Sequence, residues 1–237
     1  MTVMQELILF SFLSGFTIFL GGIAAAIFEM VTNQNIKSRV IHAVMAFGGG
    51  ILIAAIGFVL VPPAMEAFGL VKLGFIFIGG AISFQVVLDI LEKKGGSVAQ
   101  LLAMLMDYIP ESISLGALFV HNHSMGILLA IFIGLQNFPE AFNAYGDLRK
   151  TMAKKKVLLF LFSLSFTGLI AVLLGLKFLS NSPNIIAAIM AFAGGGIMFL
   201  IFQDIAPSSK VEKSARPAVW STVGFFIGMI AQKVVGG

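Results

Sequence analysis

Long apolar runs follow one another along almost the whole chain, and they constrain the fold more than any other feature. Eight of them lie at about residues 7–30, 40–62, 70–91, 98–120, 126–146, 157–179, 184–206 and 217–235. A helix needs about 20 apolar residues to cross the hydrocarbon core of a bilayer, and each run is about that long. The sequence therefore predicts an all-α polytopic membrane protein with eight transmembrane helices, forming a single transmembrane domain over residues 1–237.

Composition excludes a soluble globular enzyme. Hydrophobic residues make up 59% of the chain and charged residues only 11%, whereas about 25% of the residues in an ordinary soluble domain are charged. The mean hydropathy is +1.03, so the solvent of this chain is expected to be lipid. The chain has no cysteine, which leaves oxygen and nitrogen atoms as the ligands for any metal.

The basic residues are distributed unevenly between the two sides of the predicted membrane. Twelve of the fifteen Lys and Arg residues lie in the connections after the first, third, fifth and seventh runs. Since basic loops stay on the cytoplasmic side, this bias predicts that both termini lie outside, in a plasma membrane or an inner membrane. The net charge of +4 therefore indicates topology, and we expect no nucleic-acid partner.

Two internal repeats indicate how the helices are related. Residues 44–64 align without a gap to residues 189–209, at an offset of 145. The second and seventh runs would cross the membrane in opposite directions, so the first three and last three helices form an inverted repeat around the fourth and fifth. Transporters built this way hold their cargo near the midplane of the membrane.

The second repeat carries the acidic residues. Asp107 and Glu111 in the fourth run match Gln136 and Glu140 in the fifth, at an offset of 29, and a proline precedes each Glu. Residues four apart share one face of a helix, and three acids near a bilayer centre cost on the order of 8 to 10 kcal/mol. Compensation by a bound divalent cation is one explanation. Protonated acids that hydrogen-bond between helices, or a proton relay, are the alternatives.

These motifs resemble the ZIP (Zrt/Irt-like) divalent metal transporters, whose fourth and fifth helices carry a Pro-Glu motif. The resemblance implies eight spans, a possible homodimer and cation flux into the cytoplasm. It also implies a metal site made by Asp107, Glu111, Gln136 and Glu140, with Asn137 beside it. Where the family has histidine this chain has Asp107, which shifts the expected cargo from zinc alone toward manganese, iron(II) or cadmium as well.

The resemblance is incomplete in the sixth run. The glutamate expected there corresponds to Ala171, so a second metal in a two-metal centre is not expected.

Further polar residues have a structural and a functional interpretation. Acids near the cytoplasmic ends of the odd-numbered spans are expected either to pair with nearby basic residues or to line an exit route: Glu29, Asp89, Asp147 and Asp204. Asp204 matches an acidic position of the family, and we expect it to contact the metal. His121 and His123 lie in an outer loop, where they either collect metal or serve no such role.

Two other function classes compete with a transporter. A protein that senses or binds metal in the membrane without moving it would need the same site. A membrane-embedded hydrolase is less favoured, because the chain has no H-E-x-x-H, no G-x-S-x-G and no cysteine. We therefore expect no enzymatic activity and no resident cofactor.

Overall fold

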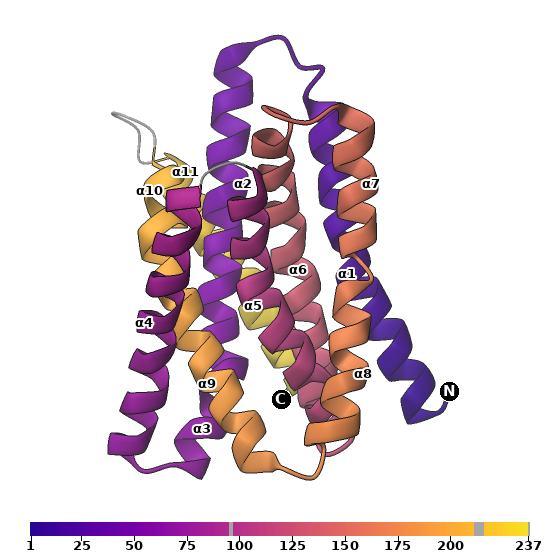
Figure 1. Cartoon of the computed structure of the whole chain (residues 1–237), viewed down its shortest axis with the longest axis vertical. Helices are drawn as coiled ribbons and strands as arrows, with labels where there is room; N and C mark the ends of the chain where they lie inside the picture. The colour runs from indigo at the N-terminus through magenta and orange to yellow at the C-terminus, as the bar shows by residue number, and fades with distance from the viewer. Residues whose placement is uncertain (95–96, 211–215, 237) are drawn as a thin grey trace.

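The structure is a computed structural model that describes residues 1–94, 97–210 and 216–236, and every regular element within them is a helix (Figure 1). The long α-helices are α1 (Val3–Phe28), α2 (Gln34–Ala55), α4 (Leu70–Lys94), α5 (Ser97–Leu118), α6 (His123–Leu148), α9 (Pro183–Leu200) and α11 (Arg216–Ala231). Shorter α-helices are α3 (Pro62–Ala67), α7 (Lys154–Leu164), α8 (Thr167–Leu179) and α10 (Ala206–Ser208). Three π-helical turns complete the fold: η1 (Ile56–Leu60), η2 (Ile201–Ile205) and η3 (Gln232–Gly236).

The all-helical membrane character predicted from the sequence is confirmed. Seven helical segments among the described residues are long and apolar enough to cross a bilayer. The acid-bearing helix α5 has 22 residues and runs through the middle of the bundle beside them (Figure 1). The exact count of eight spans stays a prediction. The sixth predicted span is broken at Ser165 and Phe166, which separate α7 from α8.

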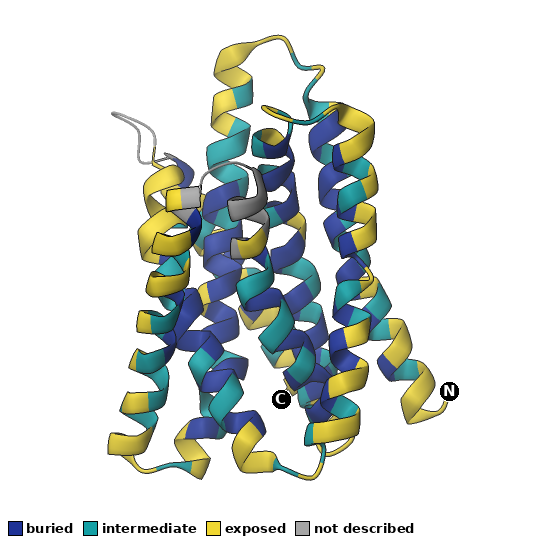
Figure 2. Ribbon diagram, in the orientation of Figure 1, coloured by how far each residue is buried: buried dark blue, intermediate teal, exposed yellow. Residues whose placement is uncertain are grey.

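The outward faces of the bundle are apolar. In α4, Leu70 is 87% exposed and Phe75 is 77% exposed, and exposed residues follow the outside of the bundle in Figure 2. An exposed apolar surface of this extent is unfavourable in water but is what the acyl chains of a bilayer require.

Helix connections gather at two ends of the bundle. The connections from α1 to α2 and from α6 to α7 lie at the upper end in Figure 1, and we call this end the basic end because Lys37, Arg149 and Lys150 lie there. The connections from α3 to α4 and from α8 to α9 lie at the opposite end, toward which the two termini also lie. Lys213, one of the twelve basic residues that predicted the topology, falls outside the described residues.

Glycines let two pairs of helices approach closely, and the two pairs use related positions. A Cβ atom at Gly50 of α2 would lie 1.9 Å from the Ser221 carbonyl oxygen of α11. A Cβ atom at Gly195 of α9, at the offset of 145, would lie 1.9 Å from the Phe77 carbonyl oxygen of α4. At these two positions the glycine-rich stretches are thus helix-packing surfaces.

Two of the π-helical turns also occur at positions related by the offset of 145. In η1 the N–H of Val61 donates to the Ile56 carbonyl oxygen at 3.1 Å, which is an i to i−5 hydrogen bond. In η2 the N–H of Ala206 donates to the Ile201 carbonyl oxygen in the same register. A proline, Pro62 or Pro207, lies two residues after the end of each turn, and because its ring crowds the preceding turn, the helix widens by one residue.

Candidate functional site

The two acid-bearing motifs lie side by side in the centre of the bundle. Glu111 of α5 is 1% exposed and Gln136 of α6 is fully buried. The Gln136 Nε2 atom donates a hydrogen bond to the Glu111 Oε2 atom at 2.5 Å. The structure therefore brings together two residues that the sequence predicted as ligands of one site.

The other two predicted ligands also meet. Asp107 of α5 is 4% exposed, and it lines the same cavity as Glu140 of α6. The backbone N–H of Tyr108 donates a hydrogen bond to the Asp107 Oδ1 atom, at 2.8 Å. Two neighbouring carboxyl groups in a protein interior disfavour the state in which both are ionised.

Several oxygen atoms of these motifs lack a hydrogen-bond partner. Among the described residues, the buried side-chain atoms without a partner include Glu111 Oε1, Gln136 Oε1, Asn137 Oδ1 and Glu140 Oε2. Buried polar atoms are nearly always paired, so each exception calls for a specific explanation. These four oxygen atoms lie on two adjacent helices, and all are acceptors, the kind of atom that binds a hard or borderline cation.

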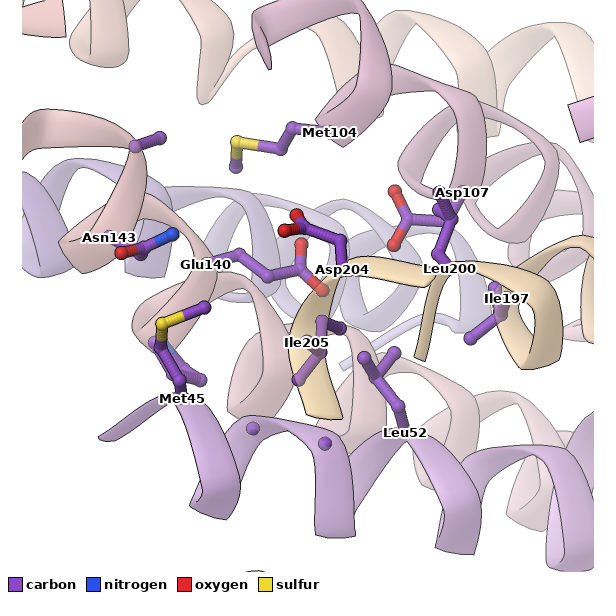
Figure 3. A pocket seen from close by; sticks show the side chains of 14 residues that line it. Met45, Leu52, Met104, Asp107, Glu140, Asn143, Ile197, Leu200, Asp204 and Ile205 are labelled. Atoms are coloured by element: carbon purple, nitrogen blue, oxygen red, sulfur yellow. The ribbon is translucent and has the colours of Figure 1, made fainter. Parts of the chain in front are cut away.

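A cavity of about 90 Å³ borders this cluster. It is lined by Asp107, Glu140, Asn143 and Asp204 together with apolar side chains of α2, α5 and α9. In Figure 3 the carboxylates of Asp107, Glu140 and Asp204 point toward one another from three different segments of the chain. The structure therefore brings Asp204 to the same site as the central acids, although it lies far from them in the sequence.

Asp204 owes its position to η2. The widened turn lies between α9 and Pro207, and Asp204 is its fourth residue. The Ser208 hydroxyl donates to the Asp204 Oδ1 atom at 3.2 Å, while the residue as a whole remains exposed. Widened turns of this kind frequently occur at functional sites because they redirect side chains.

The side chain of Asn137 points toward α1 and not toward the cavity, unlike those of Asp107 and Glu140. Its Nδ2 atom donates to the Ser14 carbonyl oxygen of α1 at 3.2 Å, and Asn137 is not among the cavity-lining residues. Tyr108, its counterpart at the offset of 29, has its hydroxyl against Gly15 of α1 and Gly168 of α8. These two side chains thus join the central helices to their neighbours.

The sequence analysis did not single out Asn143. This residue lines the cavity beside Glu140 and also lines a second cavity, of about 350 Å³, at the basic end. Its spacing of three residues after Glu140, on the same face of α6, is the sequence signal that could have identified it. Asn143 thereby connects the central acids to the basic end of the bundle.

An ion pair lies beside this second cavity. Glu29 binds Arg149 at 3.0 Å, joining the ends of α1 and α6, and accepts a hydrogen bond from the Tyr145 hydroxyl at 2.7 Å. The Tyr145 hydrogen bond and the Arg149 guanidinium hold the pKa of the Glu29 carboxyl below its ordinary value. Asp147 pairs with Lys150 at 2.5 Å, so at these two positions the structural interpretation is confirmed.

The outer-loop histidines have separate partners. His121 contacts the Ser180 carbonyl oxygen, and His123 pairs with Glu6 at 2.6 Å. Neither contact joins the two imidazoles to each other, so the structure offers no support for a shared capture site.

The residues in the described part of the chain do not form a ready-made cluster of three His, Asp or Glu side chains with metal-binding geometry. The Glu111 carboxylate accepts a hydrogen bond from Gln136. A cation bound by Glu111 and Gln136 would have to displace this hydrogen bond and take their oxygen atoms as ligands.

Comparison with known proteins gives no independent identification: no family model matches the chain, and no curated protein matches it.

Proposed function

We propose that this chain is a transporter that carries a divalent metal cation across the membrane into the cytoplasm, as its resemblance to ZIP transporters implies. The observation that carries the proposal is the group of buried, unpartnered oxygen atoms on α5 and α6 beside a cavity that contains another carboxylate, Asp204. Zinc, manganese, iron(II) and cadmium are the candidate cargoes.

The donor chemistry of the group suits a hydrated or partly dehydrated cation. Glu111 and Glu140 are the principal ligands in this proposal, Gln136 is a neutral oxygen donor, and Asp107 sets selectivity where an imidazole would favour zinc. Asp204 receives the ion on its way to the basic end. Binding would displace any proton held by Asp107 or Glu140, since a metal ligand must be deprotonated.

An inverted repeat would allow the conformational change that exposes the central site to each side of the membrane in turn. We propose that α1 to α4 and α7 to α11 are related units, and two observations support this. The close contacts of Gly50 and Gly195 occur at the same offset, and so do the turns η1 and η2. Units of this kind expose a fixed central site alternately to the two sides of the membrane.

Uptake into proteoliposomes tests the proposal. Purified protein would be reconstituted, and the accumulation of Zn, Mn, Fe(II) and Cd would be measured with Glu111→Gln, Glu140→Gln and the double variant. Each substitution keeps the volume and the hydrogen-bonding capacity of the side chain, so saturable flux should be lost while the protein remains folded. Glu6→Gln is the matched control, because Glu6 lies at the start of α1 away from the cavity.

Two results would count against the proposal. Full uptake by both single variants would contradict the assignment of the site. Metal that binds to the wild type but is never transported would favour the sensor interpretation instead.

A further inference from the structure

The cavity at the basic end combines basic and apolar side chains in one wall. It measures about 350 Å³. Three cations line it together with three large apolar side chains: Lys37, Arg149 and Lys150, and Phe28, Ile41 and Phe142. A wall of this kind suits a ligand that is itself partly charged and partly apolar.

The acids of this cavity have basic partners of their own. Glu29 pairs with Arg149 at 3.0 Å, and Asp147 pairs with Lys150 at 2.5 Å. Lys37 is half-buried, and in the part of the chain that the structure describes no acidic side chain forms an ion pair with it. The cavity therefore keeps an uncompensated positive charge, so its ligand is expected to be an anion.

Further positive charge lies at the same end of the bundle. The Lys154 Nζ atom donates to the Ala26 carbonyl oxygen at 3.1 Å, and Ala26 is the neighbour of Ala25 in the cavity wall. Lys155 and Lys156 follow Lys154 at the start of α7, whose first turn carries no acid and no side-chain cap. The unpaired N–H groups of a helix N-terminus add to the attraction for a negative charge.

The position of the cavity along the bundle is the level at which the spanning segments end. Its wall takes residues from the ends of α1 and α6 and from the start of α2. The helices α1 and α2 both pack along α6 and make little contact with each other. A ligand can therefore enter between them from the surrounding leaflet without separating either helix from α6.

The chemistry of a phospholipid matches this arrangement. Its phosphate lies just outside the hydrocarbon core, where the basic side chains are, and its glycerol backbone and acyl chains extend into the apolar region. The rings of Phe28 and Phe142, which lie 5.7 Å apart, provide apolar surface in the cavity wall. Basic pockets between transmembrane helices are known binding places for anionic lipid headgroups.

We propose that the cavity at the basic end binds the phosphate of an anionic phospholipid, with Lys37 as its principal ion-pair partner. Lys150 is the second partner, because its side chain is 74% exposed and can turn from Asp147 to the phosphate. The proposal does not depend on the cargo of the central site, since the lipid binds in the absence of metal. A free phosphate ion carries the same charge but leaves the apolar part of the wall uncovered.

Lipid titration of the purified protein in a neutral detergent tests the proposal. Phosphatidylglycerol, phosphatidylcholine with the same acyl chains, and inorganic phosphate would be added separately. Thermal unfolding would give the affinity from the rise in Tm, and native mass spectrometry would count the bound lipids. Phosphatidylglycerol should raise the Tm in a saturable way, and the other two should not.

Variants of single lysines locate the binding. Lys37→Gln should weaken the binding of phosphatidylglycerol about fivefold, and Lys37→Gln combined with Lys150→Gln should weaken it by more than about tenfold. Lys72→Gln is the matched control, because it removes the same charge at the opposite end, where the Lys72 Nζ atom lies 4.2 Å from the centroid of the Phe68 ring. This control should bind the lipid as the wild type does.

Three results would overturn the proposal. Unchanged affinity of Lys37→Gln for phosphatidylglycerol would place the lipid elsewhere. An equal loss in Lys72→Gln would show a general effect of surface charge. Stabilisation by inorganic phosphate that equals the effect of phosphatidylglycerol would show an anion site that does not recognise a lipid.

Discussion

The two halves of the acid-bearing region carry matching motifs at an offset of 29 and differ in the side chains that surround them. Toward the basic end, Asp107, Glu140 and Asp204 border a cavity. Toward the other end, Glu111 and Gln136 hydrogen-bond each other beside buried apolar residues that include Leu115. A few side-chain differences thus decide which half borders a cavity, and we call the half with the cavity the open half and the other the closed half.

The largest expected effect comes from placing an acid in the closed half. Val59→Asp would bury a carboxylate at a fully buried position, and we expect a loss of about 3 kcal/mol in stability or a failure to insert. The corresponding change in the open half, Asp204→Val, should leave stability nearly unchanged because Asp204 is exposed. Thermal unfolding in detergent measures both variants.

Equal tolerance of the two changes would contradict the assigned difference in packing. Metal flux gives a second comparison, because Asp204→Val should still reduce uptake while the fold is retained.

The close helix contacts at Gly50 and Gly195 should respond alike to substitution. Gly50→Ala and Gly195→Ala each force a Cβ atom against a backbone carbonyl oxygen, and we expect each to cost about 1 to 3 kcal/mol as the helices separate. Gly57→Ala is the matched control, since a Cβ atom there would meet nothing within 4 Å. A clear loss at only one of the two positions, measured by thermal unfolding, would break the correspondence between the helix pairs.

Proton release should distinguish the two halves of the central site. Asp107 and Glu140 are neighbouring carboxyl groups on the cavity side, and two such groups disfavour double ionisation, whereas Glu111 on the other side accepts a hydrogen bond from an amide. Metal binding should therefore release about one proton, and the dissociation constant should rise about tenfold for each unit that the pH falls below the point at which the proton is bound.

Calorimetry in buffers of different ionisation enthalpy counts the released protons. Asp107→Asn should abolish this release, since an amide can donate to Glu140 without a titrating proton. A pH dependence unchanged by Asp107→Asn would place the proton elsewhere.

The smallest expected effect lies at the basic end. The folded state lowers the pKa of Glu29 through the Tyr145 hydroxyl and Arg149. The ionised form therefore stabilises the fold above the ordinary pKa of 4.5, and this contribution is lost as the pH falls through the lower, folded-state pKa.

Glu29→Gln should thus lower stability at neutral pH by less than about 1 kcal/mol. The difference from wild type should vanish in acid. Asp147→Asn is the control, because its partner Lys150 is 74% exposed. A Glu29→Gln difference that persists at low pH would show that the ion pair is not its origin.

The apolar runs predicted most of the fold because length and hydropathy are local properties. They predicted α1, α4 and α6 to within a few residues, but not the break at Ser165 that divides α7 from α8. No proline lies between the two helices, so this break has no simple local signal. The π-helical turns were also missed, although a proline marks the end of both η1 and η2.

The site was predicted in part, because the spacing of residues within one helix is also a local property of the sequence. Asp107, Glu111, Gln136 and Glu140 are recognisable from spacing within single helices, and the structure brings them together. Asn143 was missed because its contribution depends on two cavities that the chain forms only when folded. The direction of Asn137 toward Ser14 likewise depends on a neighbouring helix.

The sequence by itself predicted the membrane environment, the helical class and the central acids. Each of these follows from composition or from the spacing of residues along one helix. Only the tertiary structure decided that Asp204 lies opposite Glu140, that Asn143 connects two cavities, and that Leu115 lies in a packed layer. These outcomes depend on how helices distant in sequence fill the space between them. The type of a single residue, apolar or polar, does not predict which residues it will contact in the folded protein.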